Sequence, residues 1–382
     1  MHRRSEPLEP GPAPRAVATS LRGADASPGA RARAACERRD WGAAFDGLAE
    51  AYEQHALEPA ELELLAECAR WVERTDMLMP PLERAHRVHA RTGDRLGAAR
   101  TALALCQAAV DLSQDSVATS WWARAGELLA ELPESAEHAF HALFECQAHA
   151  ERGEIDAQED AARRGYEIAC RVADRSAEAL LLIELGHVAT ARGRAADARS
   201  AVERATSLAI GGEIDHMATG GVLCSAIWIY RRLGEWGRAL EWTESNSRWV
   251  EEEQVRYFPG LCRVHRSEVL RIRGELVAAE HESREAARIL EETIPRWAMM
   301  AHCELGEVRR RRGDHEGALR AFQRAQELGW GPQPGLALLL LAQGDPHAAH
   351  RALERVFVET VCTWAVEDRL ELLAARVRIA LA

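Results

Sequence analysis

The chain has 382 residues, more than one ordinary domain holds, so it either divides into domains or has an architecture that grows by repetition. Hydrophobic residues make up 47% of it but aromatic residues only 5%, and the apolar residues are mostly Ala and Leu, which favour helices. The net charge is −12 and every basic residue is an Arg. This balance argues against a surface that coats nucleic acid, because phosphate binding needs clustered positive charge.

The nine cysteines lie far apart, from Cys36 to Cys362, and the closest two in sequence are Cys146 and Cys170. The sequence has no CxxC pair and no secreted disulfide framework, so we interpret the cysteines as small core residues in a reducing compartment. It also lacks an 18-residue apolar run and the apolar centre of a signal peptide. We therefore expect a cytoplasmic protein that does not bind a membrane.

Residues 1–30 carry five prolines among Gly, Ala and Arg. Such a composition buries too little apolar area to offset the entropy lost on ordering, so it predicts a disordered tail. From residue 31 to residue 382 the sequence instead shows helical segments of roughly 12–20 residues joined by short turns, without the alternation typical of strands. We therefore expect an all-α protein in which residues 31–382 form one domain of paired helices.

The sequence repeats itself. Residues 184–208 share eleven identities with residues 304–328, all at an offset of 120 and without a gap. Glycines at predicted turns recur with a period of about forty. They are Gly153, Gly193, Gly234, Gly274, Gly313 and, after a shorter interval, Gly344. Gly93 and the turn at residues 39–41 mark looser units at the N-terminal end.

Each repeated position has a physical role. A small residue before the turn, such as Gly186 or Gly306, allows the two helices of a pair to approach closely, and the turn glycine adopts the left-handed conformation that ends the first helix. Alanines after the turn keep the second helix close to its neighbours. This arrangement is the signature of tetratricopeptide-like repeats, in which antiparallel helix pairs stack. The sequence predicts a right-handed α-α superhelix with a period of about 40, in preference to an irregular helical bundle.

Four potential metal ligands, His138, His141, Cys146 and His149, fall on one predicted helix. The spacing places Cys146 off the face that the histidines share, and no second helix offers complementary ligands. We therefore interpret them as helix-face histidines and a core cysteine, and we predict no metal site.

Tryptophan is frequent for a chain with so few aromatic residues. Trp41 and Trp236 each follow a predicted turn, where a large ring can pack one unit on the next. We interpret four further tryptophans as packing residues as well: Trp121, Trp122, Trp242 and Trp249.

Two stretches, residues 222–287 and 332–344, contain short segments that can be compared with a known protein family. They include Arg238-Ala239-Leu240-Glu241-Trp242-Thr243, Arg248-Trp249, Phe258-Pro259-Gly260 and Val264-His265-Arg266-Ser267-Glu268. These pieces closely resemble the helical-repeat sensor region of actinobacterial-type LuxR-family transcriptional regulators. In that family a helix-turn-helix module that binds DNA commonly follows the repeats. The resemblance therefore implies a regulatory role, with the DNA-binding module absent from this chain.

The stretch from Trp364 to Ala382 predicts the first helix of a further unit whose second helix the sequence does not contain. We therefore expect the domain to end mid-repeat and to leave an apolar stripe without a partner. Its residues are Leu370, Leu373, Val377 and Leu381. Such a stripe predicts a sticky C-terminal end that can self-associate.

In repeats of this kind the first helix of each pair lines the concave surface, and two of its positions point into the groove. On three consecutive units this register gives six candidate partner-binding residues: Trp228 and Arg231, Glu268 and Arg271, and Glu307 and Arg310. A Trp beside Arg and Glu would give an extended peptide apolar area and directional hydrogen bonds. The alternative is structural: Trp228 packs in the core, and each Glu pairs with the Arg three residues later on its own helix.

The run of four arginines from Arg309 to Arg312 has two interpretations. It can be a phosphate-binding patch, or its cations can complement the dipole at the end of a helix. We favour the second interpretation.

Together these features predict a scaffold whose groove binds a protein, a peptide or a small-molecule effector. The resemblance implies the sensor part of a LuxR-type transcriptional regulator that makes no direct contact with nucleic acid. The alternative is a stand-alone interaction scaffold without a link to transcription. Because the sequence has no phosphate-binding loop, nucleophile motif or paired carboxylates, we expect neither an enzyme nor a cofactor.

Overall fold

The computed structural model describes residues 27–254, 259–293, 295–329, 331–360 and 366–382. Within these ranges all regular structure is helical, which confirms the predicted all-α class. Residues 1–26 of the predicted tail lie outside the described residues, as do Phe258, Cys362 and Trp364. The first described helix begins at Pro28, with the Ser27 hydroxyl accepting a hydrogen bond from the Ala30 amide, so helical structure starts within the last residues of the predicted 1–30 tail. The sequence rule missed this because proline is favoured in the first turn of a helix.

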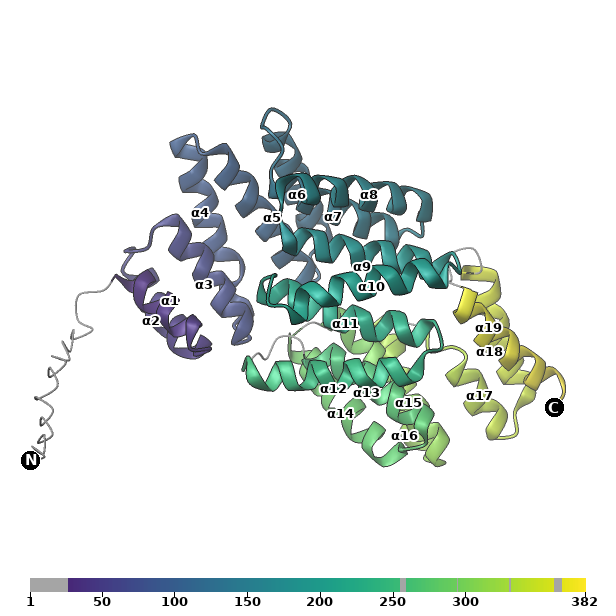
Figure 1. Ribbon diagram of the computed structural model, residues 1–382. Helices are drawn as coiled ribbons and strands as arrows, with labels where there is room; N and C mark the ends of the chain where they lie inside the picture. Colours follow the sequence, from purple (N-terminus) through teal and green to yellow (C-terminus); the bar gives the residue numbers. More distant parts are fainter. Residues whose placement is uncertain (1–26, 255–258, 294, 330, 361–365) are drawn as a thin grey trace, which may run out of the picture.

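The helices follow one another in antiparallel pairs, and we call the odd-numbered helix of each pair A and the even-numbered helix B (Figure 1). Their bounds are α1 (Pro28–Glu37), α2 (Trp41–Glu53), α3 (Pro59–Trp71), a short 3-10 helix η1 (Thr75–Met77), α4 (Met79–Thr92), α5 (Arg95–Asp111), α6 (Asp115–Leu129), α7 (Ala136–Glu151), α8 (Ile155–Val172), α9 (Arg175–Ala191), α10 (Ala195–Ile210), α11 (His216–Arg232), α12 (Trp236–Glu252), α13 (Pro259–Arg273), α14 (Leu276–Thr293), α15 (Pro295–Arg312), α16 (His315–Glu327), α17 (Gly335–Ala342), α18 (Pro346–Thr360) and α19 (Val366–Ala380).

The turn between each A helix and its B helix contains one residue with a positive φ angle. These residues are Arg39, Glu73, Ser113, Gly153, Gly193, Gly234, Gly274, Gly313 and Gly344. The predicted period of about forty is therefore confirmed, and it extends towards the N-terminus through Glu73 and Ser113. The sequence did not reveal these two turns because neither residue is a glycine. Gly93 ends α4, so it separates two units and does not mark a turn inside one.

The left-handed turn at Gly193 leads to a stability prediction. A methyl group at Gly193 would meet no atom within 4 Å, so Gly193→Ala changes only the backbone preference at φ +69°. We expect this substitution to lower the free energy of unfolding by about 1 kcal/mol. Gly47 in α2 also has open space around it but has a helical backbone, so Gly47→Ala should raise stability by roughly 0.5–1 kcal/mol. Urea unfolding midpoints that move in the same direction for both variants would contradict this account.

The small residue before the turn was predicted to let the two helices of a pair approach closely, and this holds at Gly306. A Cβ atom at Gly306 would lie 2.5 Å from the Phe322 ring on the partner helix α16, so only glycine allows this close approach. At Gly186 the nearest atom belongs instead to Ile229 of the next A helix. The small residue thus also serves the contact between successive units.

The A helices form the inner layer of the stack. From α5 to α19 each A helix packs directly on the next, whereas consecutive B helices of the described part make little or no contact with each other. Because successive A helices contact one another and successive B helices hardly do, we infer that the stack curves with the A layer on its concave side. The predicted superhelix of antiparallel helix pairs is confirmed.

The curvature brings the first described helices against the middle of the stack. The indole nitrogen of Trp41 donates a hydrogen bond to the backbone oxygen of Glu253, at 2.8 Å, and the Arg39 guanidinium makes two bonds to the Glu253 carboxylate, at 2.7 and 2.8 Å. The Trp41 ring also packs on Trp71 and His216, with centroids 5.7 and 5.4 Å away. We call these five residues the closing contact, because they join helices more than 200 positions apart in sequence.

The last helix, α19, has one buried and one exposed apolar face. Leu372, Ala375 and Ile379 are buried against α17 and α18. The four residues of the predicted stripe lie on the other face and are all exposed, from 44% at Leu373 to 84% at Leu381. The predicted stripe is thus confirmed. No helix in the described ranges has the length and apolar character needed to cross a membrane.

Candidate partner-binding face

The six predicted site residues lie on three successive A helices, α11, α13 and α15, and therefore on the concave layer. Their pairing differs from the predicted one. Arg231 of α11 donates to Glu268 of α13 at 2.8 Å, and Arg271 of α13 donates to Glu304 of α15 at 2.8 Å. The intrahelical pair of Glu268 with Arg271 is therefore wrong, because each side chain finds its partner on a neighbouring unit.

The third predicted pair does form within its own helix. Arg310 makes two hydrogen bonds to Glu307, at 2.9 and 2.7 Å, and Arg311 adds a third at 2.9 Å. Here the i,i+3 interpretation is confirmed. Across α11, α13 and α15 the charges thus form a ladder of paired groups.

Burial and pairing set the charge state of this ladder. Burial would raise the pKa of Glu268, but Arg231 and the hydrogen bond with His265 outweigh it and lower the pKa to about 2. Glu268 is therefore ionised at neutral pH. Burial raises the pKa of Glu304 to about 7, even though Arg271 is bound to it. Apart from Arg311, the ladder residues are between 5% and 18% exposed, so the charges hold the A layer together and do not form an open charged patch.

Trp228 lies beside the ladder in a cluster of its own. Its ring packs against His187 of α9, with centroids 4.6 Å apart, and the Arg232 guanidinium lies 4.8 Å from the ring centroid. We call these three residues the Trp228 cluster. The sequence argument paired Trp228 with Arg231, but Arg231 is bound to Glu268 and Arg232 is the residue over the ring.

His187 is the neutral polar group of this cluster. Its side chain is half-buried, and its ring nitrogens have no hydrogen-bond partner among the described residues. Burial, together with the nearby charges of Arg232 and His265, lowers the pKa of His187 to about 4. The imidazole is therefore neutral at pH 7, with one donor and one acceptor nitrogen.

Sequence reasoning missed two glutamates of the same face, the half-buried Glu184 and the buried Glu304. Glu184 accepts a hydrogen bond from Gln147 at 3.2 Å and contacts the Cys146 thiol at 3.7 Å, both on the preceding A helix. Glu304 likewise accepts from Ser267 and Arg271 of its preceding A helix. Both glutamates belong to the eleven identities at an offset of 120, so the signal was present in the repeat itself.

The four potential metal ligands on α7 have separate partners. His138 bonds the Ser135 amide at the start of the helix, and His141 stacks on Trp122 at 4.8 Å. His149 pairs with Glu154 at 2.6 Å, while Cys146 faces Glu184. In the described part of the chain no three potential ligands lie close enough together to hold a metal ion.

All four arginines from Arg309 to Arg312 form ion pairs with glutamates. Arg309 and Arg312 bind Glu280 of α14, and Arg310 and Arg311 bind Glu307. These contacts neutralise much of the run locally, which supports the structural interpretation.

The other tryptophans contact apolar side chains, as predicted. Trp41 is 5% exposed in the N-terminal core, and the half-buried tryptophans pack against the cores of their own regions. These are Trp121, Trp122, Trp236, Trp242 and Trp249.

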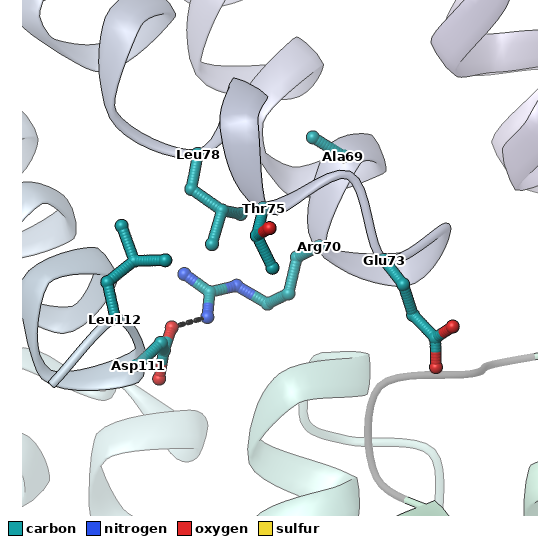
Figure 2. A pocket seen from close by; sticks show the side chains of 7 residues that line it. All are labelled: Ala69, Arg70, Glu73, Thr75, Leu78, Asp111 and Leu112. Carbon is teal, nitrogen blue, oxygen red and sulfur yellow. Dashed lines mark hydrogen bonds and ion pairs between the residues drawn. The ribbon is translucent and has the colours of Figure 1, made fainter. Parts of the chain in front are cut away.

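An enclosed cavity lies between α3 and α5, but it is too small for a ligand. Its volume is about 10 Å³, roughly that of one water molecule. Figure 2 shows Arg70 and Asp111 pointing towards one another across it, joined by an ion pair. We therefore treat this cavity as a structural site.

No family model and no curated protein matches this chain. Solved structures do match it. A Rap protein in complex with competence and sporulation factor is 12% identical with a TM-score of 0.55, over 85% of this chain and 98% of that one. NprR in complex with its cognate peptide NprX is 10% identical with a TM-score of 0.52, over 74% and 82%. The human IFIT1 dimer with m7Gppp-AAAA is 14% identical with a TM-score of 0.53, over 93% and 80%. The chain therefore has the fold of tetratricopeptide-like helical-repeat proteins.

Proposed function

We propose that this protein is a scaffold that binds an extended peptide segment of a protein partner along the concave layer of A helices. The Trp228 cluster carries the proposal. It combines an aromatic ring, a cation and a half-buried imidazole on the A helices α9 and α11. Trp and Arg are the residues most often found at the energetic centre of interfaces. A small-molecule effector would use the same cluster.

The ladder beside the cluster supports this arrangement. Arg231, Glu268, Arg271 and Glu304 already hold one another, so the A layer is rigid before a partner arrives. A preorganised surface loses less conformational entropy when a ligand binds. Arg232 and the neutral His187 would donate to carbonyl or carboxylate oxygens of a peptide, while Trp228 would bury its apolar side chains.

In the finer form of the proposal, the scaffold is the sensor part of a LuxR-type transcriptional regulator. The resemblance of residues 222–287 to that family supports this role. The Rap protein and NprR, which share the fold, were solved with competence and sporulation factor and with a peptide, respectively. The second candidate is a stand-alone interaction scaffold. A helix-turn-helix reading frame downstream of codon 382 would favour the regulator.

The same proposal makes the chain a cytoplasmic binding protein and not an enzyme, with no cofactor and no direct contact with nucleic acid. Self-association through the exposed face of α19 is part of it. Sedimentation at several protein concentrations would measure that association.

The test is the affinity of a partner recovered by cross-linking to the tagged protein in its own cells and identified by mass spectrometry. Trp228→Ala should weaken binding of that partner by at least about 30-fold, which corresponds to about 2 kcal/mol. Isothermal titration calorimetry would give the dissociation constants.

Trp242→Ala is the matched control. Trp242 packs against the same apolar core as Trp228 but lies on the outer helix α12. It should cost folding stability without changing affinity. Arg231→Ala is not a suitable variant, because it would leave the enclosed Glu268 without its cation. Normal binding by Trp228→Ala, or equal losses in both Trp variants, would refute the assignment of the face.

A further inference from the structure

Two cysteines of the first two units lie in contact. The Sγ atom of Cys36, in the last turn of α1, is 3.7 Å from the Sγ atom of Cys68 in the last turn of α3. Cys68 is fully buried in the N-terminal core, whereas Cys36 is only half-buried and remains accessible from solvent. The pair therefore combines one accessible thiol with one enclosed thiol.

We propose that Cys36 and Cys68 are an oxidative modification site, at which a peroxide converts two thiols into a reversible disulfide that joins α1 to α3. The short distance between the sulfur atoms and their unequal exposure carry this proposal. A disulfide bond is about 2.05 Å long, so the two sulfurs need to approach by only a fraction of their present separation. Both helices belong to one packed core, which holds the pair in place.

The reaction balances with hydrogen peroxide as the oxidant. The Cys36 thiolate attacks one peroxide oxygen, the O–O bond breaks, and the leaving hydroxide takes up a proton to become water. The resulting Cys36 sulfenic acid is then attacked by the Cys68 sulfur, the S–O bond breaks, and a second water leaves with the Cys68 proton. Two thiols and one hydrogen peroxide thus give one disulfide and two water molecules.

The contact between the thiols assigns the two roles. The contact with Cys68 lowers the pKa of Cys36, whereas the same contact and burial raise the pKa of Cys68. A lower pKa makes Cys36 the more readily ionised thiol, and ionised thiols react with peroxides. Cys68 then acts as the resolving thiol.

The disulfide would affect the closing contact. Arg39 and Trp41 of the closing contact follow α1 directly, and Trp71 of the same contact ends α3. A covalent link between α1 and α3 would therefore hold together the two helices that carry the N-terminal side of the closing contact. We expect slower amide exchange in α1 and α2 of the oxidised protein.

Peptide mapping of the whole chain tests the proposal. The reduced protein is treated with one equivalent of hydrogen peroxide, its remaining thiols are blocked with N-ethylmaleimide, and it is cut with trypsin without reductant. Trypsin cuts after Arg and places Cys36 in residues 34–38 and Cys68 in residues 40–70. We expect these two peptides to be linked, with a mass lower by two hydrogen atoms, and to separate after treatment with dithiothreitol.

Three variants act as controls. Cys36→Ser should prevent the linkage, and Cys68→Ser should leave a Cys36 sulfenic acid that dimedone traps. Cys170 is exposed and is not bonded to another cysteine, so Cys170→Ser should leave the linkage unchanged. Alkylation of both Cys36 and Cys68 after peroxide treatment would overturn the proposal, and so would a linkage of either one to another cysteine. The peptide map of the wild-type protein tests the proposal even if a variant fails to fold.

Discussion

Asp111→Ala is expected to lower the free energy of unfolding by about 3–5 kcal/mol, because it removes the carboxylate from an enclosed ion pair. Asp111 of α5 and Arg70 of α3 are 8% and 11% exposed and face each other across the small cavity in Figure 2. Gln107 also donates to Asp111, at 2.8 Å. Without Asp111, the Arg70 cation would lose its carboxylate in surroundings that solvate it poorly.

A double-mutant cycle separates the pair from its surroundings. Arg70→Met combined with Asp111→Leu removes both charges and should recover most of the stability that either single substitution loses. The control is Glu203→Ala, since Glu203 and Arg238 form an exposed pair that should change stability by no more than about 0.5 kcal/mol. Urea unfolding at pH 7 measures the two single variants Arg70→Met and Asp111→Leu, their combination, Asp111→Ala and Glu203→Ala. If the double variant loses as much stability as the two single variants together, the two charges do not stabilise each other.

Trp41→Ala is expected to cost about 3–5 kcal/mol and to open the stack, because one buried ring holds both sides of the closing contact. The variant loses the packing on Trp71 and His216 and the hydrogen bond to Glu253. Small-angle X-ray scattering should show a larger radius of gyration, and hydrogen exchange should become faster in α1, α2 and α3.

Trp236→Ala is the matched control for this experiment. Both residues are the first of a B helix, after the turn of their unit, but Trp236 is half-buried and packs within the central core. Its loss should cost less stability and leave the radius unchanged. An unchanged radius for Trp41→Ala would contradict the role assigned to the closing contact.

The closing contact should also depend on pH. Burial would raise the pKa of Glu253, but the hydrogen bonds from Arg39 and His216 outweigh it and hold the pKa below its ordinary value. A carboxyl whose pKa is depressed by folding stabilises the folded state above its unfolded pKa, and the stabilisation is lost as the pH falls through the folded pKa. We expect the stack to open as the pH falls below the ordinary pKa of a glutamate, and Glu253→Gln to remove this dependence.

The sequence by itself determined the helical class, the pairing of helices and the period. These features follow from local chemistry, because a glycine in the left-handed region ends a helix at a fixed place and helical periodicity needs no distant partner. The same reasoning failed at Glu73 and Ser113, where ordinary residues adopt the left-handed conformation and leave no sign in the sequence. It also located the candidate face, since the register of the A helix repeats along the chain.

Only the tertiary structure decided which groups meet on that face. Arg271 has one Glu three residues before it and another 33 residues after it, and the sequence spacing does not decide between them, whereas the packing of α13 on α15 selects Glu304. Trp41 and Glu253 meet because small rotations accumulate over many units, and no local pattern encodes their sum. The contact of Cys36 with Cys68 likewise depends on how α1 and α3 pack. Local residue preferences therefore fixed the units, and the geometry of their stacking fixed the contacts between them.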